Sequence, residues 1–164
     1  MFREIVQSLI SQLNESNQIL QYLGVFLLSF IPFVESPGGA AAGSVIGLSF
    51  ILSGLIAIGG NWISVMLVIV PFNTLLTNMR NRKSERQGFI QRRASKARKL
   101  YEKYGVPGLA LIAPLVASGH IAAFTSLVAG ADKKRVVLWH TISIIVWGVA
   151  GASIGTFINY DIMP

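Results

Sequence analysis

Two ionisable residues stand inside long apolar stretches of this sequence. Glu35 is the only carboxylate between residues 20 and 79, within the motif FIPFVESPGG at 30–39, and His120 ends a second motif, APLVASGH at 113–120. An ionisable side chain is costly to place in a membrane, so it is by default a candidate for function. We predict that Glu35 carries a proton or binds a cationic substrate. His120 would exchange protons with it across a cavity at the membrane midplane.

Structural roles account for the same residues. A small-residue helix is expected to start near Gly38, and a carboxylate just before it would cap the free N–H groups of the helix. His120, close to Ser118, could equally be a hydrogen-bonded structural residue. His140 is expected at the membrane interface and is assigned no role.

The two motifs also predict breaks in the apolar helices, at Pro32 and Pro37 in the first half and at Pro114 in the second. After each break a helix should begin at about mid-membrane depth, and two such N-termini facing one cavity would form an anion site. Neither break contains Arg or Lys, so a full phosphate charge would be weakly neutralised. The predicted substrate- or proton-binding residues are Glu35, Ser36, Gly38, Gly39, Ser118, Gly119 and His120.

The composition is that of a helical membrane protein. Of the 164 residues, 52% are hydrophobic and 13% are charged, about half the ~25% charged residues of soluble domains. The apolar stretch over 20–79 exceeds the ~20 residues that cross a bilayer. Without cysteine, with seven acids and two histidines, and without hydrolase or P-loop motifs, we expect no metal site, no cofactor and no enzymatic activity. The net charge of +7 is expected from cytoplasmic basic segments and does not indicate nucleic-acid binding.

The positions of the basic residues predict a topology. Ten of the fourteen Lys and Arg lie within 80–103 and three within 133–135, and both clusters should be cytoplasmic. The stretch between them, 104–132, is too short for two full spans of ~20 residues each. It should therefore enter the membrane and return as a re-entrant hairpin. The segment 20–46 would be a matching hairpin from the other side, which makes the two halves inverted repeats.

We therefore predict an all-α integral membrane protein with four parts. Residues 1–18 form an amphipathic interfacial helix, 19–79 the first membrane repeat, 80–103 a cytoplasmic basic amphipathic helix and 104–164 the second repeat. Each repeat is a re-entrant hairpin followed by a transmembrane helix. A solvated charged loop is the alternative for the basic segment. As a helix, it should contact anionic lipids of the inner leaflet through Arg92, Arg93, Lys96 and Lys99.

Two motifs resemble the small multidrug export protein family, a group of short prokaryotic membrane proteins distantly similar to the DedA/VTT superfamily. They are FIPFVESPGG at 30–39 and YGVPGLALIAPL at 104–115, which continues to Ser118, Gly119 and Gly130. The resemblance implies a re-entrant inverted-repeat fold, transport, and a location in the plasma membrane of a prokaryote. DedA-like relatives are associated with moving phospholipids and polyprenyl phosphates, and they typically carry arginines near the second proline motif. Ala113 and Ala117 occupy such positions here, which argues against a phosphate-lipid substrate.

These features together predict a small transporter. It would export a small molecule in exchange for protons, or translocate a lipid head group, through a cavity between the hairpins. Because a chain of 164 residues is small for such a cavity, we expect a homodimer. The alternative is a non-transport protein, structural or membrane-remodelling, whose basic helix binds anionic lipids or a partner and whose breaks serve packing alone.

Overall fold

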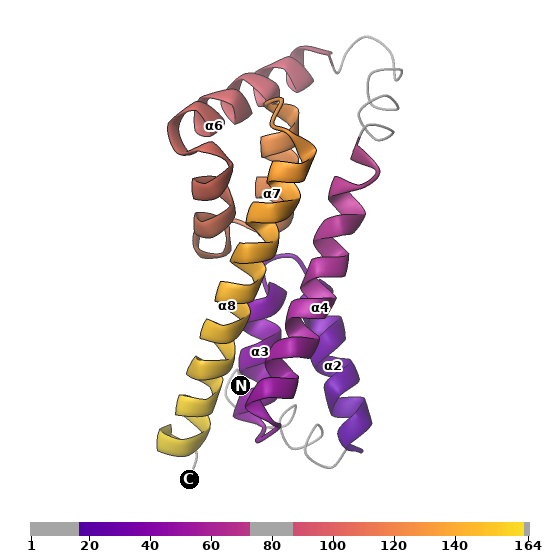
Figure 1. The fold of residues 1–164 in the computed structure, drawn as a ribbon, viewed down its shortest axis with the longest axis vertical. Helices are drawn as coiled ribbons and strands as arrows, with labels where there is room; N and C mark the ends of the chain where they lie inside the picture. The colour runs from indigo at the N-terminus through magenta and orange to yellow at the C-terminus, as the bar shows by residue number, and fades with distance from the viewer. Residues whose placement is uncertain (1–16, 73–86, 163–164) are drawn as a thin grey trace. The chain divides into compact units, whose positions relative to one another are not determined.

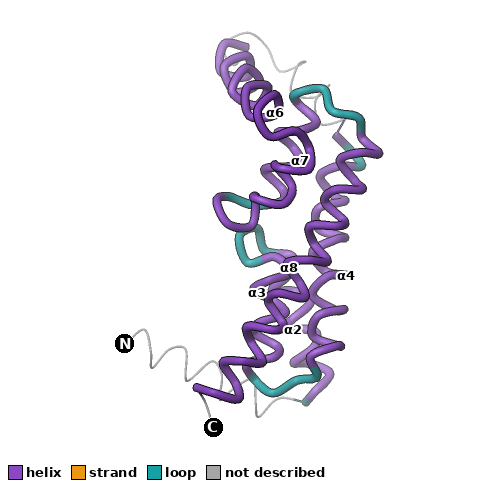
Figure 2. The backbone as a smooth tube through the Cα atoms, turned by 60° about the vertical axis from the view of Figure 1, so that its left-hand side comes forward, coloured by secondary structure: helices purple, strands orange, loops and turns teal. Residues whose placement is uncertain are grey.

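The computed structural model describes residues 17–72 and 87–162. All regular structure in this part of the chain is helical, as Figures 1 and 2 show, so the predicted all-α class is confirmed. The predicted interfacial helix at 1–18 falls almost entirely outside the described residues, as does the start of the basic segment. The helices are α2 (Gln18–Phe30), α3 (Glu35–Val45), α4 (Phe50–Ile69), α6 (Gln87–Val116), α7 (Gly119–Val128) and α8 (Lys133–Ile162).

The described helices form two compact units, and the division between the units falls within α4 and within α8. The first unit contains α2, α3, α4 as far as Asn61, and α8 from Ile144. The second contains α4 from Trp62, α6, α7, and α8 as far as Ser143. Each unit therefore combines two further helices, α2 with α3 or α6 with α7, with one portion of α4 and one portion of α8. The predicted division into consecutive repeats at 19–79 and 104–164 stays a prediction.

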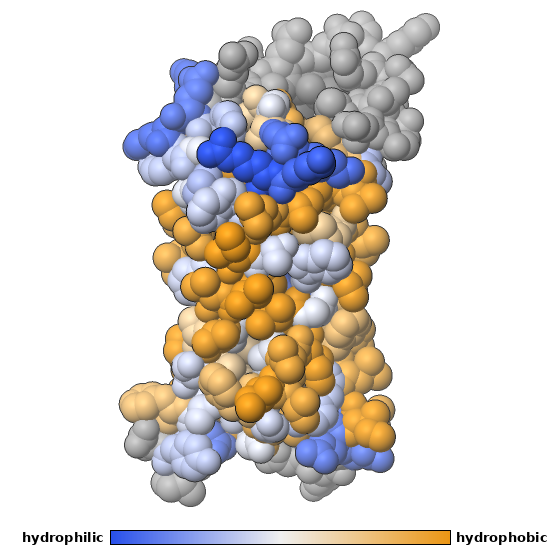
Figure 3. All heavy atoms as spheres, in the orientation of Figure 1, coloured by the Kyte–Doolittle hydropathy of each residue, from blue (hydrophilic) through white to orange (hydrophobic). Residues whose placement is uncertain are grey.

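Helices α4 and α8 are long and apolar enough to cross a membrane. Their candidate spans are Phe50–Ile69, with 20 residues, and Lys133–Tyr160, with 28 residues, against the ~20 that a bilayer requires. Only 39% and 33% of their most apolar windows are buried by the protein, whereas a helix that is apolar all round in a soluble protein is a buried core helix. Large apolar side chains such as Leu55, Leu67, Ile154 and Phe157 are exposed, and hydrophobic residues dominate the face drawn in Figure 3. Both helices are suited to a hydrocarbon environment.

The boundaries of α2 follow from local chemistry. Asn17 caps its N-terminus, with Oδ1 accepting a hydrogen bond from the Ile19 N–H at 3.0 Å. The helix ends at Phe30 because Ile31 precedes Pro32, and a residue before proline is forced out of the helical region. Ile31 accordingly has an extended backbone, with φ −74° and ψ 121°.

Helix α6 consists of two segments that meet at a kink. Gly105 has φ 61° and ψ −177°, a conformation that is essentially restricted to glycine. The kink separates a basic segment, 87–104, from an apolar segment, 106–116, and lies close to the predicted boundary between the basic helix and the second hairpin. Pro107 fits the first turn of the apolar segment, where its missing N–H has no intrahelical acceptor. Figure 1 shows the change of direction within α6.

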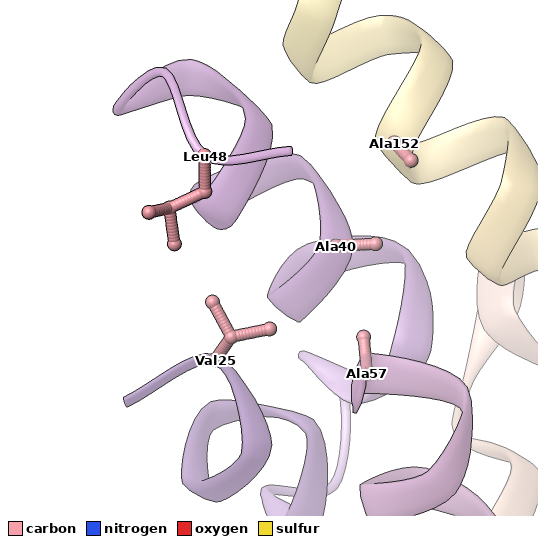
Figure 4. Packing of buried hydrophobic residues seen from close by; sticks show 5 residues of the cluster. All are labelled: Val25, Ala40, Leu48, Ala57 and Ala152. Carbon is pink, nitrogen blue, oxygen red and sulfur yellow. The ribbon is translucent and has the colours of Figure 1, made fainter. Parts of the chain in front are cut away.

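The core of the first unit is built from small and β-branched residues. Figure 4 shows Val25 of α2, Ala40 of α3 and Ala57 of α4 converging with Leu48, while Ala152 approaches from α8. Alanines at these positions keep the helix axes close, because little side-chain volume separates the backbones. The unit is therefore held by close backbone packing more than by large interlocking side chains.

Glycines on α8 bring its backbone against α3 in the same unit. A Cβ at Gly151 would overlap the carbonyl group of Pro37, and one at Gly155 would overlap that of Ala41. The two glycines are four residues apart, as in the small-xxx-small pattern by which membrane helices pack closely. The N-terminal half of α3 is therefore docked directly on the α8 backbone.

Candidate functional site

Glu35 lies where the chain reverses between α2 and α3. Its side chain is buried, with 2% of its surface exposed. Its φ is 52°, and Phe33 has φ 76°, a left-handed conformation that costs about 1–3 kcal/mol per non-glycine residue and persists only where the surroundings enforce it. The N–H groups of Val34 and Glu35 donate to the Ile31 carbonyl oxygen at 3.1 and 3.0 Å. A buried carboxylate on a strained turn is a candidate for function.

The helix that follows begins at Glu35 itself, three residues before the predicted start near Gly38. Pro37 does not break it, because the proline lies in the first turn, where the N–H groups have no intrahelical acceptor. Pro32 lies in the turn between α2 and α3. Pro114 of the second half lies within α6, which continues to Val116. Of the three prolines predicted at breaks, Pro32 is therefore the one that lies outside a helix.

The glycines of the first motif serve the packing of α3. A Cβ at Gly39 would overlap the Ser29 hydroxyl of α2 and lie 3.0 Å from the Val25 carbonyl oxygen. A Cβ at Gly38 would lie 2.7 Å from a methyl group of Val34. These two predicted site residues thus have a structural role: Gly39 lets α2 approach α3 closely, and Gly38 leaves room for the Val34 side chain.

Ser36, the residue after Glu35, belongs to a buried cluster of polar side chains. The Ser36 hydroxyl donates to the Ile144 carbonyl oxygen of α8 at 3.0 Å and accepts from Asn61 Nδ2 of α4 at 3.3 Å. Asn61 is 2% exposed, and its Oδ1 has no hydrogen-bond partner among the described residues. A buried polar atom without a partner costs about 1–3 kcal/mol, so it calls for an explanation. The Asn61 carbonyl is therefore an acceptor available to a ligand.

Asn61 is not among the site residues predicted from the sequence. A signal was present, because an amide in the middle of an apolar 20-residue helix is itself an intramembrane polar residue. The interior of the same unit also holds the hydroxyl groups of Tyr22, Ser44 and Ser53, which lack hydrogen-bond partners within the described part of the chain. The first unit therefore contains more buried polar atoms than its own contacts satisfy.

In the second unit, Ser118 and His120 form the start of α7. Ser118 is the N-cap, and its hydroxyl accepts from the His120 N–H at 3.2 Å. The imidazole lies between two hydroxyl groups, with Nε2 2.7 Å from Ser64 Oγ on α4 and Nδ1 3.2 Å from Ser118 Oγ. Because a hydroxyl can donate or accept, these neighbours can satisfy either neutral tautomer or the imidazolium. The geometry is compatible with both roles considered for His120, proton exchange and structural support.

The predicted site residues are thus found in two groups. Glu35, Ser36, Gly38 and Gly39 lie at the start of α3 in the first unit, and Ser118, Gly119 and His120 lie at the start of α7 in the second. The predicted cavity shared by Glu35 and His120 stays a prediction.

The remaining candidates are placed as follows. His140, expected at the membrane interface, is buried with 1% of its surface exposed, and its Nδ1 lies 2.9 Å from the Val136 carbonyl oxygen one turn earlier. Lys99 is exposed on the basic segment of α6. The side chains of Arg92, Arg93 and Lys96 lie outside the described part of the structure.

An all-helical fold, two helices able to cross a membrane and a buried carboxylate together define an integral membrane protein with a polar interior. Comparison with family models narrows this class. The family described as "Putative small multi-drug export protein" matches residues 35–150, most of the chain. The protein belongs to this family, as the motifs at 30–39 and 104–115 predicted. No curated protein and no solved structure matches the chain.

Proposed function

We propose that this protein is a membrane exporter in which Glu35 binds, in alternation, a proton and a cationic substrate. The family description supports export. The observation that carries the proposal is the burial of the Glu35 carboxylate, 2% exposed, on a left-handed turn. Burial disfavours the charged form of a carboxylate, so either a proton or a substrate cation would stabilise it further. Two cations competing for one carboxylate is the simplest basis for coupled exchange.

The neighbouring polar atoms favour a cation over an anion. The Asn61 carbonyl offers a neutral acceptor beside Ser36, suited to an N–H group or to a cation. A phosphate would be repelled by the Glu35 carboxylate, and the turn at 31–39 contains no Arg or Lys to offset that repulsion. A small organic cation is therefore the favoured substrate, and a lipid head group with a cationic amine is the second substrate class.

We further propose that the short helices form two re-entrant hairpins. Helices α2, α3 and α7 have 13, 11 and 10 residues, which at ~1.5 Å per residue gives about 15–20 Å. The hydrocarbon core is ~30 Å thick, so none of them could cross it alone. Each compact unit contains one such hairpin with one portion each of α4 and α8, which supports an inverted repeat. The distant similarity to the DedA/VTT superfamily is part of this proposal.

In this arrangement the basic segment of α6 would lie on the cytoplasmic face of a prokaryotic inner membrane. Ten of the fourteen basic residues lie within 80–103, as the positive-inside rule requires. Two copies would assemble as a homodimer, and the protein would act without a cofactor and without enzymatic chemistry.

Proton-coupled exchange can be tested in vesicles that contain the purified protein and an internal pH dye. With the membrane potential clamped, an imposed gradient of ethidium, a hydrophobic organic cation, should drive proton movement in wild-type vesicles. Glu35→Gln should reduce this proton flux to the level of protein-free vesicles, because the amide cannot exchange a proton. Glu102→Gln is the matched control, since it neutralises an exposed acid on the basic segment, and it should keep the wild-type rate.

Two results would overturn the proposal. Equal proton flux in wild type and Glu35→Gln would remove Glu35 from the mechanism. If wild-type vesicles move neither protons nor a fluorescent aminophospholipid faster than protein-free vesicles, transport itself is refuted and the structural alternative is favoured. Lipid movement without proton flux would overturn proton-coupled export in favour of the second substrate class.

A further inference from the structure

An apolar pocket opens in the second unit, in the angle of the α6 kink. It has a volume of about 300 Å³ and is bounded by both segments of α6 and by α7, through Leu100, Tyr104, Ile112, Val116, Ile121 and Thr125. Leu100 and Ile121 are 46% and 49% exposed, so the pocket is open to its surroundings. Small-molecule sites span roughly 300–1,000 Å³, and this pocket lies at the lower limit. It is suited to one slender hydrocarbon group.

Two lysines are the sequence neighbours of residues in the pocket wall. Lys99 and Lys103 are exposed and lie four residues apart, so they share one face of the helix. Each directly precedes a residue of the pocket wall, Leu100 or Tyr104. Lys103 Nζ lies 5.0 Å from the centre of the Tyr104 ring, a cation–π contact that holds the ammonium group at the pocket. A hydrocarbon-lined pocket therefore has a positively charged edge.

The polarity of the chain changes at the same place. The basic segment ends at Tyr104, and residues 106–116 contain no charged residue at all. In a membrane protein the boundary between head groups and hydrocarbon must therefore pass close to Gly105. An occupant of the pocket would have its apolar part on the hydrocarbon side and its charged part beside the lysines.

We infer that this pocket is a binding site for an anionic phospholipid, with one acyl chain between α6 and α7 and the phosphate on Lys99 and Lys103. An ammonium group is a strong donor to phosphate, and the apolar wall selects a molecule that also carries a hydrocarbon chain. The bound lipid would fix the angle between the basic segment and the hairpin. The site uses neither Glu35 nor any other residue of the first unit, so this proposal can be tested independently of the proposed transport mechanism.

The test measures lipid retention by the purified full-length protein in detergent, using native mass spectrometry. The probes are phosphatidylglycerol and phosphatidylcholine with identical acyl chains, and glycerol phosphate as the head group without chains. Ala117 also lines the pocket, so Ala117→Phe places a ring in it. Leu138→Phe adds the same ring at an exposed apolar position elsewhere in the unit. The double variant Lys99→Gln, Lys103→Gln removes the two positive charges beside the pocket wall. The double variant Lys134→Gln, Arg135→Gln is the charge-matched control on α8. Gel filtration and circular dichroism confirm that each variant is folded.

Wild type should retain one phosphatidylglycerol in preference to phosphatidylcholine and should not retain glycerol phosphate. Ala117→Phe should lower the affinity for both lipids about tenfold or more, while Leu138→Phe should not. Removing the two lysines should lower the preference for phosphatidylglycerol by about fivefold per lysine, from ~1 kcal/mol for each basic residue near an anionic lipid. Equal retention by Ala117→Phe and Leu138→Phe would overturn the pocket. An unchanged lipid preference in the lysine double variant would overturn the phosphate assignment, and retention of glycerol phosphate alone would refute a lipid site.

Discussion

Adding a single methyl group to Gly151 should separate α3 from α8 and so displace the turn that carries Glu35. A Cβ at this position would overlap the backbone carbonyl of Pro37 and lie 2.6 Å from its Cα atom. Both are backbone atoms, so no side-chain rotation can relieve the contact and one helix must move. Gly59 provides a matched control in the same unit, because a Cβ there meets nothing within 4 Å.

The size of the effect follows from two terms. Alanine is more favourable than glycine inside a helix by about 1 kcal/mol, and this term applies to both positions. Overpacking costs about 1–3 kcal/mol and applies only at Gly151. Gly59→Ala should therefore raise the free energy of unfolding by up to about 1 kcal/mol. The common helix term cancels between the variants, so Gly151→Ala should be less stable than Gly59→Ala by about 1–3 kcal/mol.

Unfolding in mixed micelles with increasing dodecyl sulfate, followed by far-ultraviolet circular dichroism, measures this difference. The proton flux of both variants in vesicles shows whether the displaced turn matters for exchange, and only Gly151→Ala should be impaired. If the two variants unfold at the same detergent fraction, α3 does not contact the α8 backbone at this point. The reasoning from glycine packing would then be refuted.

Three further substitutions test the local geometry. Phe33→Gly should stabilise the protein by up to about 1 kcal/mol in the same unfolding assay. The reason is that glycine tolerates the φ of 76° at this residue, and the Phe33 side chain is 70% exposed. Ile31→Gly is the control at a residue with extended backbone, and it should destabilise the protein. Asn61→Leu should keep or raise the free energy of unfolding, because it removes a buried oxygen without a hydrogen-bond partner among the described residues. The same substitution should lower proton flux, and unchanged flux would exclude the Asn61 carbonyl from the site. Ser118→Ala should lower stability by about 1 kcal/mol through loss of the α7 cap, and Ser118→Gly by less; equal losses would contradict the capping role.

The parts of the fold that could be predicted are those specified by local sequence. Apolar length predicts the two long helices, and the distribution of Lys and Arg places the boundary of the basic segment at 103–104, next to the kink at Gly105. The turn of the second predicted hairpin, within 104–132, is expected at Ser118 and Gly119. Helix α7 begins at Gly119, with Ser118 as its N-cap. Serine caps helices through its own hydroxyl, so this signal is local as well.

The parts that could not be predicted depend on contacts between distant segments. The start of α3 at Glu35 requires left-handed backbone at two residues, which packing against α2 and α8 must enforce. His140 is expected at the membrane interface from its position near the basic cluster, and the sequence does not indicate that its side chain is buried. Asn61 is one polar residue in an apolar helix, and its importance becomes visible only when Ser36 lies against it. The spacing of residues along one helix does not indicate which residues of other helices they contact.

Several of these distant contacts hold the turn that carries Glu35 and the start of α3. Ser36 is bonded to the α8 backbone and to Asn61 of α4, and the Pro37 carbonyl lies against Gly151. The turn is thus fixed by two other helices while it holds a strained residue and a buried carboxylate, which is how sites are held ready for a ligand. If the turn served packing alone, an apolar residue would fill the position of Glu35 without the cost of burying a carboxylate. Glu35→Leu therefore separates the two explanations through transport: under the packing hypothesis the proton flux is unchanged, whereas under exchange the proton flux is abolished.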